Sequence, residues 1–226
     1  MAETSIGTLA KPIPETPTDR DYQAQGDRPL IAALADPLAL FNDWLADAKA
    51  AEISDANAMA LATVDTDGFP DVRIVLLKDF SAAGFTFYTN HDSAKGRQLD
   101  GQGKAAVNFH WKSLARQVRI RGTVRRGDPA DADAYFATRA RDSQIGAWAS
   151  HQSRALPDRE ALLARHTLLT DLYREEDTIP RPPHWGGYIL EPVQIEFWQD
   201  QAYRLHDRVT YTRAPETGWA HERLNP

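Results

Sequence analysis

Residues 59–78, MALATVDTDGFPDVRIVLLK, decide how the chain folds. Two largely apolar runs, 59–64 and 72–77, lie on either side of Asp65-Thr-Asp-Gly68. Apolar runs of this length around an Asp-Gly turn are typical of a β-hairpin. We therefore predict two paired strands here, to which the sequence on both sides adds further elements.

The second strand of this hairpin is apolar in the middle and charged at both ends. Residues 74–77 are four successive apolar residues, which predicts a central strand covered on both faces. Arg73 and Lys78 bracket that run. These charged ends either meet a polar ligand or extend into solvent, as the ends of many core strands do.

Outward from the hairpin, short strands and helices follow one another without a βαβ alternation. Helices are predicted at 36–53, where Asp36-Pro37 supplies a cap and a first turn, from 92 or 93, from 128 through 136, and from 157 through 172. Further strands are predicted at 85–89, 105–111, 117–124, 187–198, 203–211 and 219–224. The predicted fold class is mainly β with accessory helices (α+β), as a barrel or sandwich.

Composition excludes several classes of function. The 226 residues carry net charge −6, so we expect no nucleic-acid partner, and no apolar run approaches the ~20 residues that span a membrane. Because the chain has no cysteine, thiolate catalysis and cysteine-based metal sites are excluded, and a cytoplasmic location is expected. The histidines are dispersed, so no metal site is predicted. We predict a mobile N-terminal arm at 1–35 and one domain at 36–226.

Three stretches concentrate polar or charged side chains, and two of them could bind an anion. Arg204, His206 and Arg208 occupy alternate positions, so an extended 203–211 would aim all three at one face; a solvated strand face is the alternative. Tyr88 to Lys95 runs from a strand into a helix start, where a phosphate could bind, although capping explains the pattern equally well. The third stretch, 139–144, is densely polar.

Taken together, these stretches resemble the pyridoxamine 5′-phosphate oxidase family of flavin enzymes. The resemblance covers about 36–226 and rests on eight strings in family order. They are RIVLLK at 73–78, FYTN at 87–90, RQV at 116–118, RDSQIGAW at 141–148, QS at 152–153, QIEFWQ at 194–199, RLHDR at 204–208 and the terminal RLNP.

The resemblance implies a homodimeric FMN-binding split β-barrel with FMN at the subunit interface. Its FMN contacts match Arg73, Ile74, Val75, Leu76, Leu77, Lys78, Tyr88, Thr89, Lys95, Gln117, Gln152, Ser153, Trp198 and Arg208. Its substrate contacts match Lys78, Tyr135, Arg139, Ser143, Arg204 and His206. FMN and the substrate each carry a phosphate, so two sets of cations and hydroxyls make physical sense.

The implied reaction is the oxidation of pyridoxamine or pyridoxine 5′-phosphate at C4′, with O₂ as acceptor and H₂O₂ released. Arg204 and His206 are the expected catalytic residues, nearest the reacting carbon. The alternatives are a same-fold oxidase of another ring, as in phenazine biosynthesis, and a non-catalytic carrier of flavin or pyridoxal phosphate. A third is nucleic-acid binding through 112–126, which the acidic total disfavours.

The chain departs from the family pattern at two places. Ala94 stands where the family often has a basic residue beside Lys95, so we expect weaker FMN retention. The arm keeps only Arg20-Asp-Tyr22 of a more basic segment, so a secondary site for the vitamer there is not expected.

Overall fold

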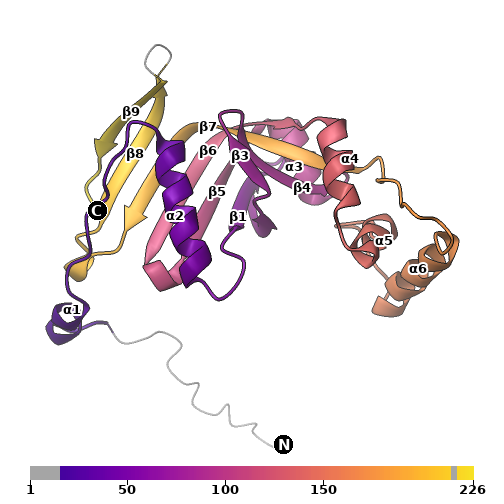
Figure 1. The fold of residues 1–226 in the computed structure, drawn as a ribbon, viewed down its shortest axis with the longest axis horizontal. Coiled ribbons are helices and arrows are strands. Elements are labelled where there is room, and N and C mark those ends of the chain that lie inside the picture. The colour runs from indigo at the N-terminus through magenta and orange to yellow at the C-terminus, as the bar shows by residue number, and fades with distance from the viewer. Residues whose placement is uncertain (1–15, 215–217) are drawn as a thin grey trace, which may run out of the picture.

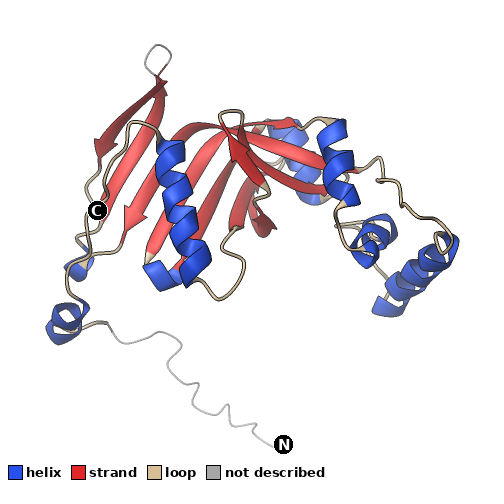
Figure 2. Cartoon of the chain, viewed as in Figure 1, coloured by secondary structure: helices blue, strands red, loops and turns tan. Residues whose placement is uncertain are grey.

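The computed structural model describes residues 16–214 and 218–226 (Figure 1). The helices are α1 (Asp19–Gln25), α2 (Pro37–Ala51), α3 (Ala94–Gln102), α4 (Pro129–Ala137), α5 (Arg141–Ala149) and α6 (Arg159–Leu172), with 3₁₀ turns η1 (Lys112–Leu114) and η2 (Ala202–Arg204). The strands are β1 (Ala58–Val64), β2 (Pro70–Leu76), β3 (Asp79–Ser81), β4 (Gly84–Asn90), β5 (Lys104–Trp111), β6 (Arg116–Arg126), β7 (Trp185–Gln199), β8 (Asp207–Ala214) and β9 (Gly218–Arg223). The predicted fold class, mainly β with accessory helices, is confirmed (Figure 2).

One antiparallel sheet contains all nine strands, in the order β2-β1-β5-β6-β7-β4-β3, with β8 and β9 added beside β7. The long strand β7 pairs with β4 through residues 185–190 and with β8 through residues 194–199. It therefore extends from the end of the molecule that carries α4–α6 to the end that carries β8 and β9 (Figure 1). Lys78 N–H donates to Thr86 O at 2.8 Å, so the chain after β2 returns to β4 and the sheet curls toward a barrel.

Helix α2 covers the inner face of this sheet because its apolar residues recur every three or four positions. The Asp36 carboxylate accepts a hydrogen bond from Leu38 N, and Pro37 opens the first turn, as predicted. Phe41 is fully buried and makes edge contacts with Phe85 and Phe109 of two different strands. This aromatic cluster fixes the helix against the barrel interior.

The second strand of the hairpin, β2, lies at the edge of the sheet, so the prediction of a central strand is wrong. Within the sheet, β2 pairs only with β1. Ile74 and Val72 are each 65% exposed, whereas Leu77, just past the strand, is buried. Four successive apolar residues do need cover on both faces. Within the described residues, nothing covers the outer face of β2.

The prediction of one strand over 203–211 is also wrong at its start. Tyr203 and Arg204 have φ values of 55° and 61°, in the left-handed region, within η2. The strand β8 begins only at Asp207. Arg204 and His206 therefore do not share a strand face with Arg208, because the alternation of side chains holds only along extended backbone.

Residues 16–35 lie against the β7–β8 connection. Ile31 N–H donates to Asp207 Oδ2 at 2.7 Å, and the rings of Tyr22 and Tyr203 lie 4.9 Å apart. The division into an arm at 1–35 and a domain at 36–226 stays a prediction, and 1–15 of that arm lie outside the described residues. No helix in the described part of the chain is long and apolar enough to cross a membrane.

Candidate active site

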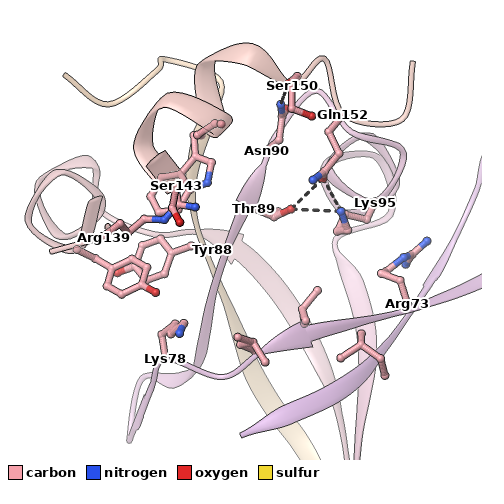
Figure 3. Close-up of a pocket in the computed structure, with 17 residues that line it drawn as sticks. Arg73, Lys78, Tyr88, Thr89, Asn90, Lys95, Arg139, Ser143, Ser150 and Gln152 are labelled. Carbon is pink, nitrogen blue, oxygen red and sulfur yellow. Dashed lines mark hydrogen bonds between the residues drawn. The ribbon is translucent and has the colours of Figure 1, made fainter. Parts of the chain in front are cut away.

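A cavity of about 710 Å³ lies between β2, β4 and the α3–α5 segments (Figure 3). It is lined by Arg73, Ile74, Val75, Leu76, Lys78, Tyr88, Thr89, Asn90, Lys95, Tyr135, Arg139, Ser143, Gly146, Ala147, Ser150, Gln152 and Trp185. Four of these residues are cationic, and no carboxylate is among them. On a chain of net charge −6, this local excess of positive charge points to an anionic ligand.

One wall of the cavity gathers a cation, a hydroxyl and an amide. Lys95 Nζ donates to Gln152 Oε1 at 2.6 Å and to Thr89 Oγ1 at 3.3 Å (Figure 3). Lys95 is in the first turn of α3, whose cap is Ser93, one of the two caps that the sequence predicts. Burial, and then the positive charge of Arg73, lower the pKa of Lys95. The negative charge of an anion bound here would favour the ammonium form and so oppose both effects.

The opposite wall holds a buried guanidinium. Arg139 Nη1 is buried and has no hydrogen-bond partner among the described residues. The group lies over the ring of Trp185, 4.9 Å from its centroid, and burial lowers the pKa of Arg139. A buried donor without a partner is costly, and a planar guanidinium suits the oxygens of a phosphate. This wall therefore fits a phosphorylated ligand.

Aromatic rings and a second cation complete that wall. The rings of Tyr88 and Tyr135 stack at 4.4 Å, and Lys78 Nζ lies 5.5 Å from the centroid of Tyr135. Ser143, in the first turn of α5, faces the same space beside Arg139 (Figure 3). The flat apolar surfaces and the cations together suit a phosphorylated aromatic ring.

The floor of the cavity is β2. Arg73 Nη1 donates to Leu61 O at 3.3 Å, and the guanidinium pairs with Asp71. Ile74, Val75 and Leu76 line the cavity with Arg73, but Leu77 does not, since its side chain enters the core. Any contact of Leu77 with a ligand in this cavity would involve its backbone.

The other predicted site residues form a second cluster near the β8 end of the sheet. Its members are Gln117, Trp198, Arg204, His206 and Arg208. Gln117 pairs with Trp198 across β6 and β7, and the rings of Trp198 and His206 lie 4.5 Å apart. Arg208 forms an ion pair with Glu196 at 2.9 Å. This second cluster shares no lining residue with the cavity, and Ser153 lies outside the cavity lining as well.

Backbone strain marks the second cluster. Two successive non-glycine residues, Tyr203 and Arg204, are left-handed, at a cost of about 1–2 kcal/mol each. Such strain persists only where surrounding contacts impose it, and it concentrates at functional sites. The unusual turn places the Arg204 side chain independently of β8.

The cavity lining also includes residues that were not predicted from the sequence. Trp185 stacks on Tyr88, with ring centroids 5.3 Å apart, and Asn90 donates to Ser150 O at 3.4 Å. Asn90 is part of the FYTN string and could have been chosen from it. Trp185 is the first residue of β7, and the apolar pattern of that strand gives no sign of a pocket. Trp185 reaches the cavity only because the tertiary fold places the start of β7 there.

Comparison with known proteins identifies similar sequences. The family described as pyridoxamine 5′-phosphate oxidase matches residues 45–170, and the pyridoxine 5′-phosphate oxidase C-terminal dimerisation region matches residues 185–226. A Hyphomonas neptunium protein named pyridoxine/pyridoxamine 5′-phosphate oxidase is 55% identical over 214 residues, which are 95% of this chain and 98% of that protein. A Brucella anthropi protein of the same name is 58% identical over 191 residues, covering 84% and 94%.

Two solved structures share the fold. PhzG from Burkholderia lata, solved with tetrahydrophenazine-1-carboxylic acid, superposes with a TM-score of 0.80 at 34% identity, covering 86% of this chain and 95% of that one. A pyridoxamine 5′-phosphate oxidase-related, FMN-binding protein from Nostoc punctiforme has a TM-score of 0.67 at 20% identity, covering 86% and 99%. The second likeness concerns the fold alone.

Proposed function

Because this chain belongs to the pyridoxamine 5′-phosphate oxidase family, we propose that its cavity and its second cluster form one active site across a dimer interface. The chain is a homodimeric split barrel and catalyses the FMN-dependent oxidation of pyridoxamine and pyridoxine 5′-phosphates to pyridoxal 5′-phosphate. The phenazine-type alternative is not favoured, since the relatives at 54–58% identity carry the vitamer oxidase name.

The residues present fit FMN. A cation-lined cavity of about 710 Å³ with an apolar β2 floor can take a ring system and a phosphate. Lys95, Thr89 and Gln152 would hold the FMN phosphate, and residues 73–78 would lie along the flavin. When bound, FMN supplies the two-electron redox chemistry that the side chains themselves lack. We propose O₂ as the final acceptor, with H₂O₂ released.

The vitamer phosphate is assigned to the wall opposite Lys95. Arg139 carries this assignment, because its buried Nη1 has no partner in the part of the chain that the structure describes. Lys78, Tyr135 and Ser143 line the same side of the cavity. Together they would anchor the substrate at a point remote from C4′ and so supply binding energy for its orientation.

The second cluster would come from the partner subunit. The matched dimerisation region, residues 185–226, contains Trp198, Arg204, His206 and Arg208. The exposed apolar face of β2 lies beside the cavity and needs cover that residues 16–214 and 218–226 of its own chain do not give. A two-fold partner could supply both the cover and the cluster, because such an interface presents each patch twice. Arg204 and His206 would then lie nearest the reacting carbon.

Turnover of phosphorylated and unphosphorylated vitamers tests this function. The FMN-loaded protein should form pyridoxal phosphate and peroxide from pyridoxamine phosphate and from pyridoxine phosphate. Arg139→Ala should raise KM for the phosphorylated substrates by about ten- to a hundredfold, the value of a charge-assisted bond, and should not change the rate measured with unphosphorylated pyridoxine. A flavin carrier would release no peroxide. The cytoplasmic location predicted from composition stays a prediction.

A further inference from the structure

The Arg139 guanidinium is held by aromatic rings rather than by a carboxylate. Arg139 Cζ lies 4.9 Å from the ring centroid of Trp185 and 5.5 Å from that of Phe136. Within the described residues Arg139 forms no ion pair, and its buried Nη1 has no hydrogen-bond partner. Arg126, by contrast, pairs with Asp100 at 2.7 Å.

The kind of support decides what a guanidinium can offer to a ligand. A carboxylate occupies the N–H donors and neutralises the positive charge. An aromatic face attracts the cation through its quadrupole and leaves both the charge and the N–H donors available. Arg139 is therefore held in a state that suits a phosphate group, whose oxygens can accept two parallel N–H bonds.

The Trp185 indole is itself fixed before any ligand binds. Trp185 is only 7% exposed, and its ring is nearly parallel to that of Tyr88, at 6° with 5.3 Å between the centroids. Trp185 N–H donates to Pro182 O at 3.0 Å, and Arg181 Nη1 donates to Trp185 O at 2.5 Å. Arg139 lies between α4 and α5, so this rigid ring limits the positions that its long side chain can take.

We propose that Trp185 is a positioning residue for the substrate, because its indole face holds the Arg139 guanidinium where it meets the vitamer phosphate. The inference rests on the proposed assignment of that phosphate to the Arg139 wall. An arginine loses side-chain freedom when it binds a ligand, and a guanidinium already stacked on a ring loses less. Removal of the indole should therefore weaken the binding of phosphorylated vitamers specifically.

Binding of a substrate analogue tests the proposal without turnover. 4-Deoxypyridoxine 5′-phosphate has the ring and the phosphate but no oxidisable group at C4′, and 4-deoxypyridoxine lacks the phosphate as well. Calorimetry of the FMN-loaded protein measures both Kd values. Trp185→Met replaces the ring by an adaptable side chain, and we expect it to raise Kd for the phosphorylated analogue by about three- to thirtyfold, the range of a cation–π interaction. Kd for 4-deoxypyridoxine should stay within about twofold.

The same substitution in the Arg139→Ala background shows whether Trp185 acts through Arg139. We expect no further change in Kd there, because the guanidinium that the indole holds is gone. An equal rise of Kd in both backgrounds would overturn the proposal. A wild-type protein that binds both analogues equally well would refute the phosphate assignment and this proposal with it. A preference for the phosphate that survives Trp185→Met undiminished would refute the positioning role alone.

Two further variants separate positioning from general packing. Trp44 is the matched control, since it is 6% exposed and its ring centroid lies 4.5 Å from Arg116 Cζ, but neither residue lines the cavity. Trp44→Met should leave both analogue Kd values unchanged. Trp185→Phe keeps an aromatic face and should hold Kd within about threefold of the wild-type value. A loss as large as that of Trp185→Met would overturn the proposal.

Steady-state kinetics with pyridoxine 5′-phosphate give a second readout. Trp185→Met should raise KM by about the same factor as Kd, while kcat at saturating substrate and FMN affinity stay within about twofold. If Trp185→Met does not fold, Trp185→Leu removes the ring in the same way and carries the same expectations. A fall in kcat or in FMN affinity as large as the rise in KM would make Trp185 merely structural and overturn the proposal.

Discussion

Lys95 lines the cavity, to which we assign FMN binding, and His206 belongs to the second cluster, to which we assign the oxidation step. If Lys95 holds the FMN phosphate as proposed, Lys95→Ala should weaken FMN binding by about 1.5–3 kcal/mol, or roughly ten- to a hundredfold in Kd, because a charge-assisted contact is lost. His206→Ala should instead reduce kcat and leave FMN affinity nearly unchanged. Flavin fluorescence titration of the apoenzyme and turnover at saturating FMN measure the two effects. Equal losses of both quantities in either variant would contradict the division.

The neighbour of Lys95 offers the opposite change. Ala94 opens α3 and is only partly buried, so a longer side chain can extend from it. Ala94→Arg adds a cation where the family often has one, and we expect tighter FMN binding by about threefold to tenfold. The same titration checks this prediction. An unchanged Kd would show that the missing cation is not what limits FMN retention.

At the level of single residues, the sequence predicted most of the residues that line the cavity but missed some of them, such as Trp185. Lys78, Lys95 and Arg139 lie far apart in the chain and converge on one cavity. The resemblance to the family located them, since no local pattern places Arg139, just after α4, opposite Lys95 of α3. Trp185 escaped prediction because its role comes only from the tertiary position of β7.

Among the elements, α3 depends on a close approach to the turn before it. A Cβ added at Gly96 would lie 2.0 Å from His91 O, whereas one added at Gly101 in the same helix would contact nothing within 4 Å. Gly96→Ala should therefore destabilise the protein by about 1–3 kcal/mol and displace Lys95, which weakens FMN binding. Gly101→Ala should stabilise it by roughly 0.5–1 kcal/mol. Thermal unfolding with and without FMN distinguishes the two variants. Similar melting temperatures for Gly96→Ala and Gly101→Ala would contradict a special requirement for glycine at position 96.

The turn before α3 contains His91, whose imidazole can titrate near neutral pH. Burial, and then the positive charge of Arg126, lower the pKa of His91 from its ordinary value of 6.5, although Asp100 opposes the shift. Between the folded and the ordinary pKa, the unfolded chain binds more protons, so stability should fall as pH drops below about 6.5. His91→Leu should lose that part of the pH dependence. Melting temperatures between about pH 5 and 7.5 test this, and parallel curves for the two proteins would refute it.

The errors at element level have physical causes. The four apolar residues at 74–77 do predict a strand with two covered faces, but the described part of the chain leaves the outer face of β2 uncovered. The stretch 203–206 alternates like a strand, yet residues 203 and 204 are left-handed. Propensity cannot anticipate strain that tertiary contacts impose. The helices with Asp caps, α2, α4 and α6, were predictable because the cap precedes a helical pattern; α5 has no side-chain cap and was missed.

For the whole molecule, the separation of the two clusters gives a decisive experiment. When the vitamer phosphate is kept well below the wild-type KM, Arg139→Ala impairs the cavity and His206→Ala impairs the second cluster, so each homodimer alone has two defective sites. If each site takes its cavity from one subunit and its second cluster from the other, a mixed dimer has one intact site and one doubly defective site. Random exchange makes half of the dimers mixed, so about a quarter of all sites recover.

Activity after subunit exchange should therefore rise from near zero to about a quarter of the wild-type value. The two variants are unfolded together, refolded with FMN and assayed for peroxide release, with each variant refolded alone as the control. If one chain supplied both clusters to its own site, every site in a mixed dimer would contain one defect and activity would stay at the level of the controls. The assay thus distinguishes a site built from both subunits from a site built within one subunit, because only in the first case does a mixed dimer contain a site without a substitution.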